Sequence, residues 1–473
     1  MVRTAATKHA ATQVQAAAPG PRIEGGNGVP RVYFGTDGIR GRVGSEPMTV
    51  EFALRLASAA ARVLASEGGM VLIGKDTRLS GYMFEAALEA GFVASGVNVL
   101  LAGPLPTPAI AFMTRHLECS FGVVISASHN PYEDNGIKFF DRQGLKLSEQ
   151  IEERIEQHLT LQPLTRASRE LGRAHRVDTS RIAYQEFCAG LLPAGMNFAG
   201  LKLVVDCANG AAYKIAPRIL ADLEAEIVPI GCSPNGRNIN DGCGSIHPEL
   251  LQLTVPGVRA HAGIAFDGDG DRVVMVDHLG RLVDGDQLLY VIAADAQAQG
   301  TLRGPVVGTV MSNFGLELAL RRLGVEFRRA PVGDRHVLAQ LIEHGGVLGG
   351  ETSGHILCLD RTTTGDGLVT ALQVLRIMKQ SGRTLAELTA GMEKLPQVLL
   401  NVQVPRRFDP ASIPAISAAV LRIEAHLAGE GRIVLRASGT EPVIRVMVEG
   451  RDESEVRGCA DELAQVVRSA APG

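Results

Sequence analysis

The sequence lacks several features that mark particular classes of protein. It has no tryptophan, only 4% aromatic residues, and seven scattered cysteines with no CxxC pair among them. We therefore expect reduced thiols that bind no metal. No stretch approaches the roughly 18 to 20 apolar residues of a membrane-spanning helix, and no amino-terminal apolar block resembles a secretory signal. These absences exclude a membrane-spanning or disulfide-stabilised protein and favour a cytoplasmic one.

The charge balance argues against nucleic acid and membranes as partners. Lys and Arg number 47, Asp and Glu number 51, and the formal net charge is -4. Without a basic excess we expect neither nucleic acid nor a membrane surface as a partner.

The length of 473 residues exceeds what one hydrophobic core usually serves, so several domains are expected. Residues 1–30 are rich in Ala and Gly and read as a disordered tail. After this tail we predict three α/β domains, which resemble loose structural repeats, and a smaller last domain. The predicted limits are residues 31–181, 182–282, 283–394 and 395–473.

The fold class follows from alternating helical and strand-like segments. Helical spacing covers residues 49–65 and 84–94, and apolar strands are predicted at 70–73, 121–126, 201–205, 263–266, 304–310 and 347–348. From about residue 396 the order changes to strand, helix, two strands and helix, which is typical of an α+β domain. Most strands run into polar loops, and open α/β sheets bind ligands at such strand ends. We therefore expect four polar loops to meet at one cleft.

The loop DGDGDR, residues 267–272, holds three carboxylates separated by glycines. Two such charges about 4 Å apart repel by about 1 kcal/mol in water and about 4 kcal/mol at a protein-like dielectric, so a cation is the natural compensation. Oxygen ligands favour magnesium or calcium. An EF-hand loop is excluded because its sixth position would be Arg272 rather than Gly and its twelfth His278 rather than Glu. A solvated acidic turn remains the alternative to a metal site at Asp267, Asp269 and Asp271.

The second loop, ISASHNP, places Ser126 and Ser128 directly after an apolar strand, with His129 next to Ser128. A lone Ser beside a His is more often a turn residue than a nucleophile, and this one lacks the GxSxG context. The separate triple-carboxylate loop raises the odds, because phosphoryl transfer needs a metal to neutralise the moving charge. Lys138 could add a positive donor, or it could be an ordinary strand lysine.

Two further loops carry ligand-binding chemistry. RASGTEP offers a guanidinium, two hydroxyls and close backbone amides, which suit a phosphate, although a polar hairpin turn is an equal alternative. GGETSGH supplies Glu351 and Ser353 for sugar hydroxyls. His355 could shuttle a proton, although a lone histidine is usually structural.

These four loops occur in the order and spacing of the α-D-phosphohexomutase family, which the chain resembles from about Val32 to near its carboxyl end. The strings YFGTDGIRG, NDGCGSIHPE, TTTGDG and SGTEPVIRVMVEG are similar to those of its glucosamine-directed bacterial members. The resemblance implies three mixed-sheet α/β domains and a TATA-binding-protein-like α+β domain.

The resemblance also implies roles for individual residues. Ser128 would be the phosphoserine, and its phosphate would bind one Mg²⁺ per chain together with Asp267, Asp269 and Asp271. Positive or polar groups around the reacting phosphate would be Arg40, Lys138, His129 and Arg272. The sugar would be held by Glu351 and Ser353, and the phosphate that is not transferred by Arg436, Ser438, Gly439 and Thr440.

The implied activity is interconversion of glucosamine 6-phosphate and glucosamine 1-phosphate through a bound glucosamine 1,6-bisphosphate, which would feed UDP-N-acetylglucosamine synthesis. A phosphomannomutase or phosphoglucomutase of the same fold and a non-catalytic sugar-phosphate binding protein are the alternatives. A binding protein would not require both a phosphorylatable serine and a metal cage. We expect a monomer or a homodimer.

Overall fold

The computed structural model describes residues 32–437 and 442–472. The predicted tail, residues 1–30, and the loop residues Ser438, Gly439 and Thr440 lie outside these ranges. Four sheets divide the described chain, and three of them are mixed sheets of parallel and antiparallel strands. The predicted fold class is confirmed.

The first domain is built on a six-stranded sheet of order β1-β5-β4-β2-β3-β6. Its elements are β1 (Ile39–Arg42), α1 (Val50–Leu64), β2 (Gly69–Lys75), α2 (Ser80–Ala94), β3 (Val97–Pro104), α3 (Thr107–His116), β4 (Phe121–Ile125), β5 (Asp134–Asp141), α4 (Glu149–His158), the 3₁₀ turn Ser168–Glu170 and β6 (Ala174–Arg176). Strand β4 is buried along its whole length because it lies inside the sheet, between β5 and β2. The loop that follows β4 therefore starts from a rigid base.

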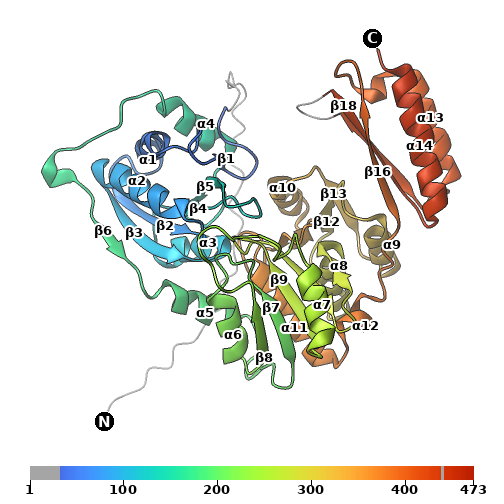
Figure 1. Cartoon of the computed structure of the whole chain (residues 1–473), viewed down its shortest axis with the longest axis horizontal. Helices are drawn as coiled ribbons and strands as arrows, with labels where there is room; N and C mark the ends of the chain where they lie inside the picture. The colour runs from blue at the N-terminus through green and yellow to red at the C-terminus, as the bar shows by residue number, and fades with distance from the viewer. Residues whose placement is uncertain (1–31, 438–441, 473) are drawn as a thin grey trace.

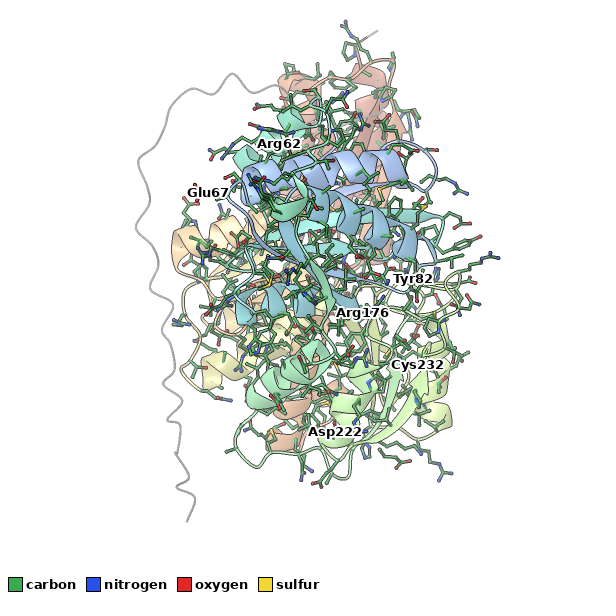
Figure 2. The ribbon with its side chains drawn as sticks, turned by 90° about the vertical axis from the view of Figure 1, so that its left-hand side faces the viewer. Arg62, Glu67, Tyr82, Arg176, Asp222 and Cys232 are labelled. Carbon is green, nitrogen blue, oxygen red and sulfur yellow. The ribbon has the colours of Figure 1, made fainter. Side chains whose placement is uncertain are left out.

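The second domain has a five-stranded sheet of order β11-β10-β9-β7-β8. Its elements are α5 (Ser180–Gly190), β7 (Lys202–Asp206), α6 (Ile215–Asp222), β8 (Glu226–Ile230), α7 (Glu249–Gly257), β9 (Ala262–Phe266), β10 (Val273–Asp277) and β11 (Leu282–Val283). Strands β9 and β10 form an antiparallel pair whose connection is the DGDGDR loop. Figure 2 shows the outer side of the first two domains, with Arg62 and Glu67 on the first and Asp222 and Cys232 on the second.

The third domain has a four-stranded sheet of order β13-β12-β14-β15. Its elements are α8 (Gly285–Ala298), β12 (Val306–Thr309), α9 (Phe314–Arg322), β13 (Phe327–Ala330), α10 (Asp334–His344), β14 (Leu348–Gly350), β15 (Ile356–Cys358), α11 (Gly367–Ser381) and α12 (Leu385–Thr389). Helix α8 begins with a capping box, in which Asp284 and Gln287 satisfy each other's backbone N–H groups. This cap fixes the start of α8 beside the GGETSGH loop.

The fourth domain is a three-stranded antiparallel sheet of order β16-β18-β17 covered by two helices. Its elements are β16 (Gln397–Gln403), the 3₁₀ turn Pro410–Ser412, α13 (Pro414–His426), β17 (Arg432–Ala437), β18 (Val443–Glu449) and α14 (Glu453–Ala470). Figure 1 shows this domain standing apart from the first domain, with α13 and α14 on its outer side.

The hydrophobic cores separate the fourth domain from the rest. One continuous cluster of buried side chains runs through the first three domains, and a second cluster fills the other face of the first sheet. The fourth domain packs its own cluster between its sheet and α13 and α14. The first three domains therefore form one packed body, whereas the fourth is joined to it mainly by polar contacts.

Within the described ranges, no helix is both long and apolar enough to cross a membrane. All seven cysteines lie in these ranges, and they are free thiols.

Candidate active site

The loop after β4 holds Ser128 in an unusual backbone conformation. Ser128 has φ of 52°, which lies in the left-handed region that non-glycine residues seldom adopt, and it is completely buried. Its N–H donates to the Ser126 hydroxyl at 3.0 Å, and its carbonyl accepts from Arg78 at 3.2 Å and from Asn240 at 3.0 Å. Surrounding contacts from both the first and the second domain thus maintain a conformation that the residue alone would not favour.

A buried ion pair supports this loop from below. The Ser126 hydroxyl donates to Asp76 at 2.5 Å, and Asp76 is also paired with the fully buried Arg78. Burial raises the pKa of Asp76, although Arg78 and the Ser126 hydroxyl act in the opposite direction. Ser126 is therefore a supporting residue, and its hydroxyl is already committed.

The three carboxylates of the loop between β9 and β10 converge, as predicted. One oxygen from each of Asp267, Asp269 and Asp271 lies within 4.8 Å of the others, and all three residues are at most 3% exposed. The Ser128 hydroxyl donates to Asp267 Oδ2 at 2.5 Å. Gly268 is needed for this approach, because a Cβ there would lie 2.5 Å from the Ser128 carbonyl oxygen.

The donor set fits a hard divalent cation. Asp269 Oδ1 and Asp271 Oδ1 are buried and accept no hydrogen bond from the described residues. Asp267 Oδ1 is instead oriented by the N–H groups of Gly270 and Arg272, at 3.1 and 3.2 Å. Oriented carboxylate oxygens with unused lone pairs are what Mg²⁺ or Ca²⁺ requires.

Lys138 connects the first domain to this cluster. It is buried in β5, and its Nζ lies 2.8 Å from Asp269 Oδ2, 2.9 Å from Asp37 Oδ2 and 3.5 Å from Asp271 Oδ2. Burial would lower its pKa, but the three carboxylates outweigh burial and raise it. Lys138 is therefore a fixed positive charge.

The carboxylates of the loop differ in their protonation preference. Burial, followed by repulsion from Asp271 and Asp269, raises the pKa of Asp267 well above its usual value. Burial also acts to raise the pKa of Asp271, but Lys138 and His355 outweigh it and lower that pKa. A cation bound to the three carboxylates would favour the ionised form of Asp267.

His129 and Arg272 also lie close to Ser128. The His129 Nδ1 atom is 3.4 Å from the Ser128 hydroxyl and 2.9 Å from an Arg272 guanidinium nitrogen. Burial, followed by repulsion from Arg272 and Arg40, lowers the pKa of His129 to about 4. His129 is thus neutral near pH 7. Arg40 pairs with Asp37 and lies 3.5 Å from the Ala127 carbonyl oxygen.

The GGETSGH loop reaches this cluster through His355. Its Nδ1 atom is 3.7 Å from Asp271 Oδ2, and its Nε2 atom is 3.3 Å from Asp334 Oδ2. Burial would lower the pKa of His355, but Asp271 and Asp334 raise it to about 10. The imidazole is therefore a cation near pH 7, which suits a proton donor better than a base.

Glu351 and Ser353 occupy less enclosed positions on the same loop. Glu351 is half-buried and accepts the Gly333 N–H at 3.0 Å, whereas Ser353 is exposed. Arg436 is half-buried near the end of β17, opposite Arg445 of β18. Among the described residues, Arg436 makes no hydrogen bond or ion pair with the loops of the first three domains.

Three further charged residues complete the cluster, and the sequence analysis did not single them out. They are Asp37, Lys146 and Asp334. Lys146 pairs with Asp37 and, at 2.6 Å, with Asp334 Oδ2. Burial acts to raise the pKa of Asp37, but Lys138, Lys146 and Arg40 lower it well below its usual value. Asp37 could have been singled out because it lies in the GTDGIRG string, whereas nothing around Lys146 or Asp334 distinguishes them from surface residues.

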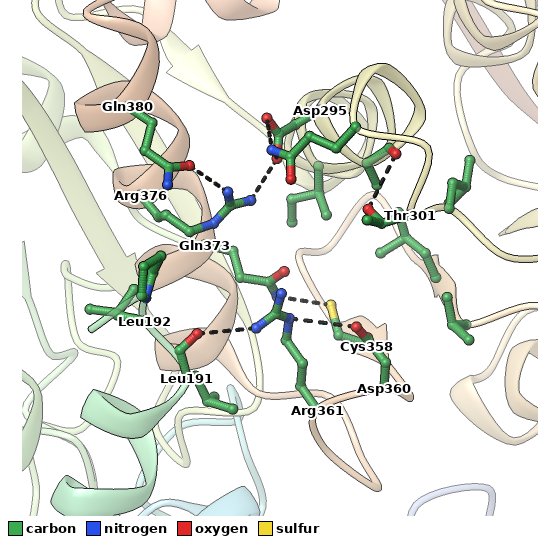
Figure 3. Close-up of a pocket in the computed structure, with 17 residues that line it drawn as sticks. Leu191, Leu192, Asp295, Thr301, Cys358, Asp360, Arg361, Gln373, Arg376 and Gln380 are labelled. Carbon is green, nitrogen blue, oxygen red and sulfur yellow. Dashed lines mark hydrogen bonds and ion pairs between the residues drawn. The ribbon is translucent and has the colours of Figure 1, made fainter. Parts of the chain in front are cut away.

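A separate pocket of about 480 Å³ lies between α8 and α11, away from this cluster (Figure 3). Its two arginines already have partners. Arg376 binds Asp295 at 2.6 Å and Gln380 at 2.7 Å, and Arg361 binds the Leu191 carbonyl oxygen at 3.3 Å. None of the predicted site residues lines this pocket.

Comparison with known proteins agrees with this geometry. Models of the phosphoglucomutase/phosphomannomutase α/β/α domains I, II and III match residues 31–164, 191–280 and 284–395, and the model of the C-terminal domain matches residues 399–466. The phosphoglucosamine mutase of Methylococcus capsulatus is 56% identical over 93% of this chain and 98% of its own length. That of Alkalilimnicola ehrlichii is 57% identical over 93% and 97%.

Solved structures show the same fold. A phosphoglucomutase/phosphomannomutase family protein from Burkholderia thailandensis superposes with a TM-score of 0.77 at 26% identity, covering 93% of this chain and 98% of that one. The Aspergillus fumigatus N-acetylphosphoglucosamine mutase, solved with GlcNAc-6P and magnesium, has a TM-score of 0.66 at 20% identity, covering 94% and 96%. The chain therefore belongs to the phosphoglucomutase/phosphomannomutase family, and its sequence relatives within that family include proteins named phosphoglucosamine mutase.

Proposed function

We propose that the protein interconverts glucosamine 6-phosphate and glucosamine 1-phosphate through a phosphoserine at Ser128. The observation that carries this proposal is the 2.5 Å contact between the Ser128 hydroxyl and Asp267, one of three clustered carboxylates from another domain. A nucleophile beside a cation-binding cluster is the arrangement that phosphoryl transfer needs. The names of the sequence relatives supply the amino sugar.

The proposed reaction balances without consuming phosphate. The bond between the phosphorus and the Ser128 Oγ breaks, and a bond forms between that phosphorus and the O1 atom of glucosamine 6-phosphate. The bound product is glucosamine 1,6-bisphosphate, and the O1 proton passes to the protein. After the intermediate turns over, the bond between O6 and its phosphorus breaks and that phosphorus bonds to the Ser128 Oγ. The O6 atom takes a proton back from the protein, and glucosamine 1-phosphate is released.

Asp267, Asp269 and Asp271 would hold one Mg²⁺ together with the seryl phosphate. When bound, Mg²⁺ neutralises charge on the transferred group, which carries about -1.5 to -2 charge as a phosphoserine. Lys138 orients Asp269 and adds a fixed positive charge beside the metal ligands. The cationic form of His355 can donate a proton near the same group, so we retain it as a proton donor.

The rest of the substrate would lie between the third and fourth domains. Glu351 and Ser353 present acceptors to the sugar, and a carboxylate such as Glu351 favours an amino group that is cationic near neutral pH. Arg436, with Ser438, Gly439 and Thr440, would hold the phosphate that is not transferred. The separate core of the fourth domain allows it to move and to rebind the intermediate in the opposite orientation.

A substrate panel tests the proposal. With Mg²⁺ and a catalytic amount of a hexose 1,6-bisphosphate, glucosamine 6-phosphate should give a higher kcat/KM than mannose or glucose phosphates. Equal turnover of the other sugars would leave the mutase class but reject the amino-sugar preference.

The nucleophile is tested by Ser128→Ala, which should abolish turnover and leave the melting temperature near that of the wild type. Substantial mutase activity in this variant would reject the phosphoserine mechanism. A wild type that binds phosphosugars but turns none over would instead favour a non-catalytic binding protein.

A further inference from the structure

The start of α8 touches the loop that carries Glu351 and Ser353. The Gly285 N–H donates to the Thr352 carbonyl at 3.0 Å, and the Thr352 hydroxyl donates to Asp286 Oδ2 at 2.7 Å. The packing is close, because a Cβ on Gly285 would lie 2.1 Å from the Glu351 carbonyl oxygen. Any displacement of this loop would therefore also displace the first turn of α8.

The same Asp286 oxygen also binds the segment that leads to the fourth domain. Asp286 Oδ2 accepts the Asn313 N–H at 2.9 Å. The Asn313 side chain holds both backbone groups of Leu395, accepting its N–H at 3.0 Å and donating to its carbonyl at 3.0 Å. Leu395 stands two residues before β16, so Asn313 fastens the entrance to the fourth domain.

Asn313 also reaches into the fourth domain itself. Its Nδ2 atom is 3.3 Å from Glu449 Oε1, and the completely buried Glu449 pairs with Arg432 of β17. Arg432 returns to the third domain, where it donates to the carbonyls of Val310 at 3.0 Å and Ser312 at 2.7 Å. These bonds anchor the first residue of β17 against the third domain.

Strand β17 extends from this anchor toward the phosphate-binding loop. Arg432 is its first residue and Arg436 lies four residues further on, which is about 13 Å along an extended strand. A strand paired along its length with β18 is stiff, so a rotation at Arg432 is carried to Arg436. The orientation of the anchor thus sets where Arg436 points.

We propose that Thr352, Asp286 and Asn313 couple the loop that carries Glu351 and Ser353 to the contacts that hold the fourth domain on the third. These contacts are made by Leu395, Arg432 and Glu449, and we call them the pivot of the fourth domain. Asp286 and Asn313 are at most 2% exposed, and the chain from Thr352 to Leu395 and Glu449 is continuous. A sugar bound at Glu351 and Ser353 would stabilise this chain and favour one orientation of β17. The three residues are positioning residues, and their role in catalysis depends on the function proposed above.

Hydrogen exchange of the full-length protein tests the coupling without relying on activity. Thr352→Val replaces the hydroxyl with a methyl group of similar size, and Thr352→Ser retains the hydroxyl as the matched control. We expect the amide of Leu395 to exchange about fivefold faster in Thr352→Val, the effect of losing one hydrogen bond of typical strength, and to return to the wild-type rate in Thr352→Ser. Asn313→Ala should expose the same amide more strongly.

Kinetics and ligand binding provide the second readout. Adding glucosamine 6-phosphate should slow exchange in β17 of the wild type, and this protection should be lost in Thr352→Val. The KM of Thr352→Val should rise about fivefold with less change in kcat, because binding of the distal phosphate is weakened.

Wild-type exchange at Leu395 and β17 in Thr352→Val would overturn the coupling, even if KM rose, since Thr352 would then act on the sugar directly. Failure of Thr352→Ser to restore the wild-type values would overturn it as well. If the wild type has no mutase activity but Leu395 still exchanges faster in Thr352→Val than in the wild type, the link between the loop and the pivot is supported. Only the proposed function is then rejected.

Discussion

Ser128 is held in place by its neighbours more than by its own conformational preference. Its left-handed backbone costs on the order of 1 kcal/mol or more, and the bond from its N–H to Ser126 helps to offset this cost. The strained backbone directs the hydroxyl toward Asp267. Supporting residues should therefore affect the rate of transfer without being phosphorylated themselves.

Ser126→Ala tests this support. We expect kcat to fall about tenfold or more, because Ser128 loses a hydrogen bond that sets its geometry. Phosphate should still map to Ser128 in a phosphopeptide analysis. An inactive Ser126→Ala with no phosphate on Ser128, together with phosphate on Ser126 in the wild type, would show that the neighbouring serine is the acceptor.

Asp269→Asn tests the metal site. One anionic ligand is lost while the side-chain size is preserved, so the Mg²⁺ concentration for half-maximal activity should rise about tenfold or more. A magnesium titration of activity measures this shift.

Asp222→Asn is the matched control, because Asp222 lies on the outer surface of the second domain (Figure 2). Within the described part of the chain, its one ion-pair partner is Arg218. Its titration curve should match the wild type. A wild-type curve for Asp269→Asn would place the metal elsewhere.

At the scale of elements, strands were predicted well because apolar runs bounded by polar loops are a local signal. The strand predicted at 263–266 is Ala262–Phe266, and the helix predicted at 49–65 is Val50–Leu64. The predicted helix at 84–94 begins earlier, at Ser80, because its first turn is Gly-containing and offers no apolar periodicity.

The charged cluster was only partly predictable. Asp267, Asp269 and Asp271 are adjacent in the sequence and carry their own pattern. Lys146 and Asp334 belong to different domains and meet only because the domains pack together. No local sequence pattern predicts that contact. The hydrogen bond between Asp286 and Asn313, within the third domain, is equally absent from any local pattern.

The first turn of α8 has a pH dependence of its own. Burial, followed by repulsion from Asp284, raises the pKa of Asp286 to about 6. Since the pKa in the folded state is above the unfolded value, Asp286 does not reduce stability below about pH 4, and its destabilising contribution grows as the pH rises through 6. The loss is roughly 2 to 3 kcal/mol for a shift of about two pKa units.

Asp286→Asn removes this titration. Thermal unfolding of the wild type and Asp286→Asn at several pH values between about 4.5 and 7.5 should show the variant gaining stability relative to the wild type as the pH rises. A difference that is constant across this range would contradict the assignment.

At the scale of the whole molecule, the first and third domains are fastened across their seam. Arg335 of α10 binds both carboxylate oxygens of the buried Glu152 in α4, at 2.7 and 3.2 Å, and also the Leu147 carbonyl at 3.2 Å. Lys146 and Asp334 form a second link beside it. These bonds keep the two domains that carry Ser128 and Glu351 at a fixed separation.

Arg335→Met should therefore destabilise the three-domain body by about 1 to 3 kcal/mol, since a bidentate pair with one buried partner is lost. Differential scanning calorimetry should show a lower melting temperature for the unfolding of this three-domain body. Arg321→Met removes an exposed arginine of the same domain that pairs with Glu317 along α9, and it should change stability by less than about 0.5 kcal/mol. Equal effects of the two substitutions would show that the seam contributes nothing specific.

In the proposed mechanism, the fourth domain is the part that moves. Its separate core and its polar pivot at Arg432 and Asn313 contrast with the continuous core of the other three domains. Such a division suits a reaction in which the nucleophile and metal ligands stay fixed while the grip on the distal phosphate is released and restored.

In the proposed mechanism, Ser128 carries the phosphoryl group between the two positions of the sugar. Intact-mass measurement and phosphopeptide mapping after incubation with Mg²⁺ and a hexose 1,6-bisphosphate test it most directly. We expect one added phosphoryl group, located on Ser128 and absent from Ser128→Ala. When glucosamine 6-phosphate is supplied, an isotopic label on that group should pass to the sugar phosphate while Ser128 is phosphorylated again. Full turnover by a protein that never carries phosphate on Ser128 would contradict it.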